Sequence, residues 1–269
     1  MRPHHFIERG HVSIRYAAEG EGQELVALIH EMGGSLESWD RLVPLMRGKR
    51  ILRFDMRGFG MTSKVVGVND LDAIADDLAF LLEALGLDAP VHVAGMAVGA
   101  AAAVRFAKRH PMRLASLALA GPALGVSEEK QEALRVRADR IEREGVVAIA
   151  EDELGATYAL ALREAKSFDD YCARWLRNDP ASYAATCRML ARLNMQDELG
   201  ELRAPTLFLA GALDPLRPPT LVECYAHRVV NSRFETLVSG HVPAWQTPTL
   251  FHAALQNFWA QLLHQGCRS

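Results

Sequence analysis

Short apolar runs recur along the first 124 residues of the chain and are separated by stretches of helical periodicity. Runs with so few polar positions are typical of strands buried on both faces of a sheet. They lie at 24–30, 50–55, 90–96 and 113–121. Apolar residues at helical spacing follow at 71–86 and 97–109, and the first of these stretches ends at Gly86, a good C-cap. Alternating strands and helices predict a parallel sheet covered on both faces.

The same region contains further elements. Residues 5–20 alternate over short stretches with a turn at Gly10, which predicts strands. A helix is also expected around Trp39, Leu42 and Val43, between the first two buried runs.

The pattern changes between about residues 125 and 200, where the chain reads as amphipathic helices with no strand between them. Strand and helix then alternate again at 204–212, from about 218, at 232–240 and at 249–264. The sequence therefore predicts an α/β fold with one doubly wound, mostly parallel, eight-stranded sheet. Residues 1–124 and 198–269 would form its core domain, and residues 125–197 an inserted helical cap.

Composition narrows the functional classes. The chain is 49% hydrophobic and 23% charged, with a formal net charge of −3, so a nucleic-acid partner and a basic binding face are not expected. No apolar run approaches the ~20 residues of a membrane span, and the N-terminus lacks the apolar core of a signal peptide, which predicts a cytoplasmic protein without a membrane partner. The four cysteines form no C-x-x-C pair and no phosphate-binding glycine fingerprint is present, so neither a metal nor a cofactor is predicted. The sequence leaves a homodimer open.

Candidate chemistry falls where predicted strands end. These positions are His30-Glu31-Met32-Gly33-Gly34, Gly95-Met96-Ala97-Val98-Gly99, Asp214 and His241. Open parallel sheets bind their ligands at this edge. The order of nucleophile position, acid and histidine resembles the α/β-hydrolase fold family, as does the turn DMRGFGMTS at 55–63. The chain looks most similar to small capped bacterial hydrolases such as 3-oxoadipate enol-lactonases and C–C bond hydrolases.

Asp214 and His241 each have a plain structural interpretation. Asp214 could be a turn residue before Pro215, and His241 a polar residue satisfied near a strand end. Their placement after buried strands and in this order favours a catalytic pair, with Asp214 orienting His241 as the base. The family pattern also implies that the N–H groups of Met32 and Val98 form an oxyanion hole, with Gly33 in the same binding turn. Gly95 and Gly99 would permit the sharp strand-to-helix turn.

Two residues depart from the family pattern. The family usually has glycine after the histidine of the first motif, where this chain has Glu31, and a nucleophile where it has Ala97. Glu31 could point to solvent or bind a nearby amide, or it could place a carboxylate beside the pocket, where burial would make it an acid or base. Ala97 has three explanations: a natural loss of the nucleophile, an introduced serine-to-alanine change, or a misread motif. Ser35 and Ser239 lie near the crevice but on turns of another kind, and Glu31 as a second departure favours a natural loss.

What remains would still support chemistry on a small-molecule substrate. His241 could deprotonate water or a substrate while the N–H groups hold an oxyanion, as in ester or lactone hydrolysis by water, or in lyase, decarboxylase or isomerase steps. Four aromatic residues of the predicted cap, Tyr158, Tyr171, Trp175 and Tyr183, are candidates for the pocket wall. An apolar crevice of this kind suits a small ester, lactone or keto acid. The alternative is a non-catalytic protein that binds a small ligand in the same cavity.

Overall fold

A computed structural model describes residues 4–266 of the chain. Eight strands form one sheet in the order β1-β2-β4-β3-β5-β6-β7-β8. Their bounds are β1 His5–Arg9, β2 Val12–Glu19, β3 Leu25–Ile29, β4 Arg50–Phe54, β5 Val91–Met96, β6 Leu114–Ala120, β7 Thr206–Gly211 and β8 Ser232–Leu237. The β1–β2 and β2–β4 pairs are antiparallel, and all other neighbours are parallel. The predicted mostly parallel sheet is confirmed.

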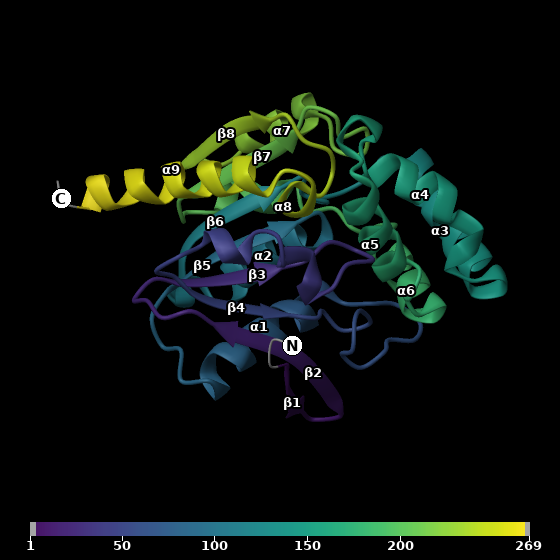
Figure 1. Cartoon of the computed structure of the whole chain (residues 1–269), viewed down its shortest axis with the longest axis horizontal. Coiled ribbons are helices and arrows are strands. Elements are labelled where there is room, and N and C mark those ends of the chain that lie inside the picture. Colours follow the sequence, from purple (N-terminus) through teal and green to yellow (C-terminus); the bar gives the residue numbers. More distant parts are fainter. Residues whose placement is uncertain (1–3, 267–269) are drawn as a thin grey trace.

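Helices cover both faces of the sheet because alternate side chains of each buried strand point to opposite sides. In β3, Leu25, Ala27 and Ile29 join the core cluster of one face, whereas Val26 and Leu28 join that of the other. The first face is covered by α1 (Leu71–Ala84), α2 (Val98–Arg109) and α7 (Pro219–Ala226). The second is covered by α8 (Pro243–Gln246) and α9 (Pro248–Gly266), the yellow helix that runs out to the C-terminus in Figure 1.

The helix expected around Trp39 is wrong in type, because the segment forms two short 3₁₀ helices. They are η1 (Leu36–Trp39) and η2 (Val43–Leu45). Pro44 has no N–H to donate in a continuing helix, and the N–H of Leu36 donates to the Asp55 carboxylate at 2.6 Å instead. Trp39 and Leu42 are nevertheless fully buried, so the apolar pattern marked burial correctly but not the helix type.

The chain between β6 and β7 contains the helices expected at 125–200. They are α3 (Glu128–Glu144), α4 (Ala150–Thr157), α5 (Ala165–Trp175) and α6 (Pro180–Leu190), with 3₁₀ helices η4 (Val146–Ile149), η5 (Leu160–Leu162) and η6 (Asp197–Glu201); a further one, η3 (Pro111–Arg113), precedes β6. Figure 1 shows α3 to α6 together at one side of the molecule, away from the end of α9. We call residues 125–197 the helical insertion; its standing as a separate cap stays a prediction.

The base of the insertion is closed by its own two ends. Gly125 and Asn194 form an isolated antiparallel bridge, and the N–H of Met195 donates to the carbonyl of Leu124 at 2.8 Å. Residues 146–165 do not form one continuous helix, since Tyr158 at the end of α4 has extended backbone angles. The insertion is therefore a loop of short helices whose ends leave the sheet side by side.

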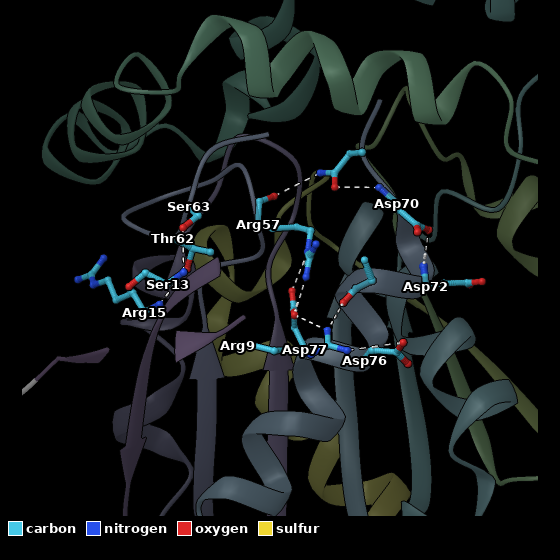
Figure 2. Close-up of polar contacts among 12 residues, drawn as sticks. Arg9, Ser13, Arg15, Arg57, Thr62, Ser63, Asp70, Asp72, Asp76 and Asp77 are labelled. Carbon is cyan, nitrogen blue, oxygen red and sulfur yellow. Dashed lines mark hydrogen bonds and ion pairs between the residues drawn. The ribbon is translucent and has the colours of Figure 1, made fainter. Parts of the chain in front are cut away.

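The turn at 55–63 is held by polar contacts from two neighbouring elements (Figure 2). The side chains of Ser63 and Thr62 accept main-chain N–H groups of β2 at 2.8 and 2.9 Å. Arg57 makes two hydrogen bonds to the buried carboxylate of Asp77 in α1, at 2.7 and 2.8 Å. Asp55, itself fully buried, connects this turn to the start of η1.

Asp55 should be a strong stability determinant, because one carboxylate oxygen accepts from Leu36 N–H and the other from Met61 N–H and the Arg15 guanidinium. In Asp55→Asn one of these acceptors becomes an NH₂ group facing a donor. We expect a loss of about 3 kcal/mol in the free energy of unfolding, as for other broken buried polar pairs. Urea unfolding measures it, with exposed Asp152→Asn as the matched control. Equal stability of the two variants would contradict the role assigned to Asp55.

Candidate active site

The turn between β5 and α2 has an unusual backbone. Ala97 has φ +50° and ψ −110°, and in the described part of the chain it is the only non-glycine residue with positive φ. A Cβ added at Gly95 would lie 2.4 Å from the carbonyl oxygen of Gly99, and one added at Gly99 would lie 2.2 Å from that of Ile29. Both glycines are therefore required by close backbone approach, as the sequence pattern predicted for a sharp strand-to-helix turn.

Two main-chain N–H groups beside this turn have no acceptor. The first N–H groups of a helix lack an intrahelical partner, and Val98 begins α2. Within residues 4–266 neither Val98 N–H nor Met32 N–H donates to a protein acceptor. Met32 follows His30, whose buried ring ties this turn to the end of β4: Nδ1 lies 2.7 Å from the carbonyl of Glu31, and Nε2 accepts from Met56 N–H at 2.9 Å. The two free donors are thus on rigidly held backbone.

His241 and Asp214 form a buried pair at the same edge of the sheet. His241 Nδ1 lies 2.8 Å from Asp214 Oδ2. The other carboxylate oxygen of Asp214 accepts from the N–H groups of Leu216 and Arg217 at 2.9 and 3.1 Å. Burial raises the pKa of Asp214, but the His241 charge and these hydrogen bonds outweigh it, so the pKa is lower than usual. An ionised carboxylate only accepts hydrogen bonds, so His241 Nδ1 is the donor in this contact and Nε2 is left free of it.

The pair is packed against Gly121, a residue that the sequence analysis did not single out. Gly121 directly follows β6 and has φ +50°. A Cβ there would lie 3.2 Å from Asp214 Oδ2 and 3.5 Å from His241 Nδ1. The sequence held part of this signal, because Gly121 ends a buried strand. That Gly121 lies beside the predicted acid depends on the order of the strands in the sheet.

Ala97, Val98, Met32 and His241 line one cavity of about 230 Å³. Most of its wall is apolar, and Thr157 and His241 are among the polar residues that line it. The remaining lining residues are Ala123, Val126, Lys130, Ala133, Leu134, Arg137, Glu153, Leu190, Leu216 and Arg217. Sequence reasoning missed Lys130, Arg137 and Glu153, because helical periodicity does not tell which turn of an inserted helix faces the sheet edge. It also missed Arg217, which lies in the loop between β7 and α7.

The prediction that four aromatic residues form the pocket wall needs correction. Among the described residues that line the cavity, none of Tyr158, Tyr171, Trp175 and Tyr183 appears. All four are buried in the packing between the insertion and the core. Tyr158 contacts the Tyr171 ring edge-on, and Trp175 contacts the Tyr183 ring in the same way. Two of the tyrosine hydroxyl groups are used internally: Tyr171 donates to Thr157 at 3.0 Å and Tyr183 to Glu153 Oε1 at 3.0 Å. The large aromatic rings therefore pack in the interior, and other side chains line the cavity.

Glu31 lies neither in solvent nor in the cavity wall. Its carboxylate is almost fully buried, accepts from Ser38 Oγ at 2.9 Å, and lies 4.0 Å from Arg174 Nη2 of α5. The neighbouring Gly33 also meets α5, since an added Cβ would lie 2.6 Å from the Trp175 ring, and Asn178 donates to the Gly33 carbonyl at 2.9 Å. Through these contacts, Glu31 and Gly33 attach the turn that contains Met32 to the insertion.

Metal ligands and membrane-spanning helices are two further features that the described residues could contain. No group of three or more His, Cys, Asp or Glu side chains among them is placed to hold a metal ion. Within that same part of the chain no helix is both long and apolar enough to cross a bilayer.

Comparison with known proteins gives the following similarities. A family model described as serine aminopeptidase, S33 matches residues 20–239. 3-Oxoadipate enol-lactonase 2 of Acinetobacter baylyi is 23% identical over 91% of this chain and 92% of its own length. The 2-hydroxy-6-oxo-6-(2'-aminophenyl)hexa-2,4-dienoic acid hydrolase of Metapseudomonas resinovorans is 32% identical over 48% of this chain and 46% of its own. A thermophilic esterase from Thermogutta terrifontis, solved with malate bound, is 28% identical, with a TM-score of 0.88 over 96% of this chain and 98% of that one.

Close packing at the turn predicts that Gly95→Ala destabilises the protein. The new methyl group would collide with main-chain atoms of Gly99 and Ala100, which cannot rotate away as a side chain does. We expect the free energy of unfolding to fall by about 3 kcal/mol, the upper range for overpacking. The matched control is Gly155→Ala in α4, where an added Cβ meets nothing within 4 Å and helix propensity favours alanine. Equal unfolding midpoints for the two variants would refute the packing argument.

The depressed pKa of Asp214 predicts a specific pH dependence. A carboxyl group whose folded pKa lies below its unfolded value of about 3.9 stabilises the fold above that pH, and the contribution is lost as pH falls through the folded pKa. The stability difference between the protein and Asp214→Asn should therefore be largest near neutral pH and shrink below about pH 4. Chemical unfolding at a series of pH values measures it. A difference that stays constant or grows toward acid pH would exclude a stabilising ionised Asp214.

Proposed function

The chain belongs to the serine aminopeptidase S33 family of α/β-hydrolases and is related to enol-lactonases and C–C bond hydrolases; on that premise we propose that it is an enzyme acting on a small organic ester, lactone or keto acid. The observation that carries the proposal is the oriented His241–Asp214 pair, 2.8 Å apart, opening onto the cavity lined by Ala97, Met32 and Val98. In this proposal His241 is the base, Asp214 orients it, and the N–H groups of Met32 and Val98 form the oxyanion hole.

Ala97 occupies the position of the nucleophile in this proposal. Its positive φ is typical of the strained strand-to-helix turn that exposes a nucleophile in this fold. This conformation argues against a misread motif. Ser35 bonds to Glu37 and Ser239 to Thr247, and no serine or cysteine is among the described residues that line the cavity. In this proposal the reaction on this chain proceeds without a covalent intermediate at position 97. Whether Ala97 is natural or an introduced replacement of serine is decided by the variants below.

Hydrolysis would use water directly. His241 Nε2 takes a proton from a water molecule, whose oxygen bonds to the substrate carbonyl carbon while the carbonyl π electrons move onto oxygen. The two free N–H groups stabilise that oxyanion. When the carbonyl re-forms, the bond to the leaving oxygen breaks, and the leaving group receives the proton from His241. A β-keto acid would use the same groups differently. Its carboxylate would leave as CO₂, the electron pair of the broken C–C bond would form an enolate held by the oxyanion donors, and a proton from water would then give the ketone.

Three proteins test the proposal: this chain, His241→Ala and Ala97→Ser, assayed on a panel of esters, enol-lactones and β-keto acids. Removing the base should lower turnover by about 10² or more, the usual contribution of acid–base catalysis. His227→Ala, which changes an exposed histidine after α7, is the matched control and should leave turnover unchanged. Turnover that survives His241→Ala would contradict the role of His241 as the base. Binding without turnover by both this chain and Ala97→Ser would contradict the enzyme proposal and support the non-catalytic binding protein.

Ala97→Ser separates the two origins of the alanine. If the pocket is built around a serine, the variant should gain esterase activity by orders of magnitude, because nucleophile, base and acid act as a unit. If the pocket is built around Ala97, the added hydroxyl gains little and occupies the space of the reacting water.

A further inference from the structure

The charges in the cavity wall do not balance. Three cationic residues and one carboxylate line it, in addition to His241. Arg137 and Glu153 neutralise each other in a direct ion pair, and Tyr183 donates to the same carboxylate at 3.0 Å. Lys130 is exposed at the cavity wall, where water solvates it. The remaining cation is Arg217, which follows Asp214 by three residues and is only partly exposed.

Arg217 has few partners for a charged group in such a place. Its Nη1 donates to the carbonyl of the adjacent Leu216 at 2.8 Å, and its buried Nε has no acceptor. Among residues 4–266 no carboxylate forms an ion pair with it. Asp214 is near, but its oxygens already accept from His241 and from two main-chain N–H groups. Burial lowers the pKa of Arg217, outweighing the nearby Tyr225 and Asp214.

A guanidinium that is partly removed from water without a counter-ion is costly. Such a cost is recovered when an anion binds, and the planar fork of arginine fits a carboxylate better than any other side chain does. We propose that Arg217 is an anion subsite of this cavity and that it holds a carboxylate of the bound molecule beside the His241–Asp214 pair. Lys130 adds a second positive charge to the same wall. This inference rests on the proposed function only in taking the cavity as the substrate site.

The cavity volume limits the anion to a small molecule. An apolar protein cavity of about 150 Å³ holds benzene, which has six non-hydrogen atoms. The volume of about 230 Å³ here therefore suits a molecule of about nine. The apolar wall beside Ala97 takes its hydrocarbon part, and the free N–H groups take a carbonyl oxygen. A short carboxylic acid with a second carbonyl group meets all three requirements.

The probes are 4-oxopentanoate and its uncharged methyl ester, which differ in the charge that Arg217 would bind. Calorimetric titration of this chain should give at least tenfold tighter binding of the acid, because a charge-assisted, desolvated pair contributes more than the neutral ester can. Arg217→Gln should remove this preference while leaving binding of the ester within about twofold, since one interaction alone is lost. Arg203→Gln is the matched control: Arg203 also donates to a main-chain carbonyl, of Gly200, but is exposed outside the cavity.

Each other outcome overturns the subsite. Equal binding of acid and ester, no binding of the acid, or a preference that survives Arg217→Gln would each do so. If Arg217→Gln does not fold, Arg217→Lys replaces it, and the acid should then bind more weakly but still better than the ester, because the charge remains and the bidentate fork is lost. The readout is binding and not turnover, so a failure of the His241 test would leave this result standing, and the reverse also holds.

Discussion

The candidate site depends on the backbone conformation of Ala97. Positive φ costs a residue with a side chain on the order of 1–3 kcal/mol, so the surrounding structure must impose it. It does so through three main-chain hydrogen bonds: Ala97 N–H donates to Ala120, and its carbonyl accepts from Ala101 and Ala123 at 3.2 and 3.1 Å. These bonds fix the turn to β6 as well as to α2. The start of α2 is thereby held at the sheet edge, with its first N–H groups directed away from any internal acceptor.

The same constraint explains why residues far apart in sequence meet. Parallel strands bring their carboxyl ends to one edge, so the segments after β3, β5, β7 and β8 lie around the start of α2. The segment after His241 then binds the insertion, because Gln246 donates to the Thr157 carbonyl and Trp245 to the Ser167 carbonyl. On the other side Asn178 holds the Gly33 carbonyl. The insertion is thus attached to both turns that flank the cavity, which makes its position part of the site geometry.

Much of this could be predicted from sequence, because the spacing of apolar residues and the positions of turn-forming residues carry the information. Buried strands and the glycines around Ala97 are local signals, and His241 and Asp214 follow from chain order. The wall of the cavity is not a local property. Tyr183 and Glu153 both lie on inserted helices with an inward face, yet Glu153 lines the cavity and Tyr183 lies behind it. Which of two inward residues reaches an open space depends on how helices cross, and periodicity does not contain that. The short helices at 36–45 were mispredicted for a similar reason, because the partner of the Leu36 N–H is the distant Asp55.

A methyl group at the strained turn changes what the rest of the site can do. His241 Nε2 has no hydrogen-bond partner among the described residues, so no protein hydroxyl there competes for it. His241 therefore lines a small cavity in which most of the other lining side chains are apolar. In the function and subsite proposed above, the free N–H groups and Arg217 would determine how a bound molecule lies relative to His241. A site that cannot form a covalent bond through Ala97 must rely on that orientation alone, and its retained elements are the ones that orientation requires.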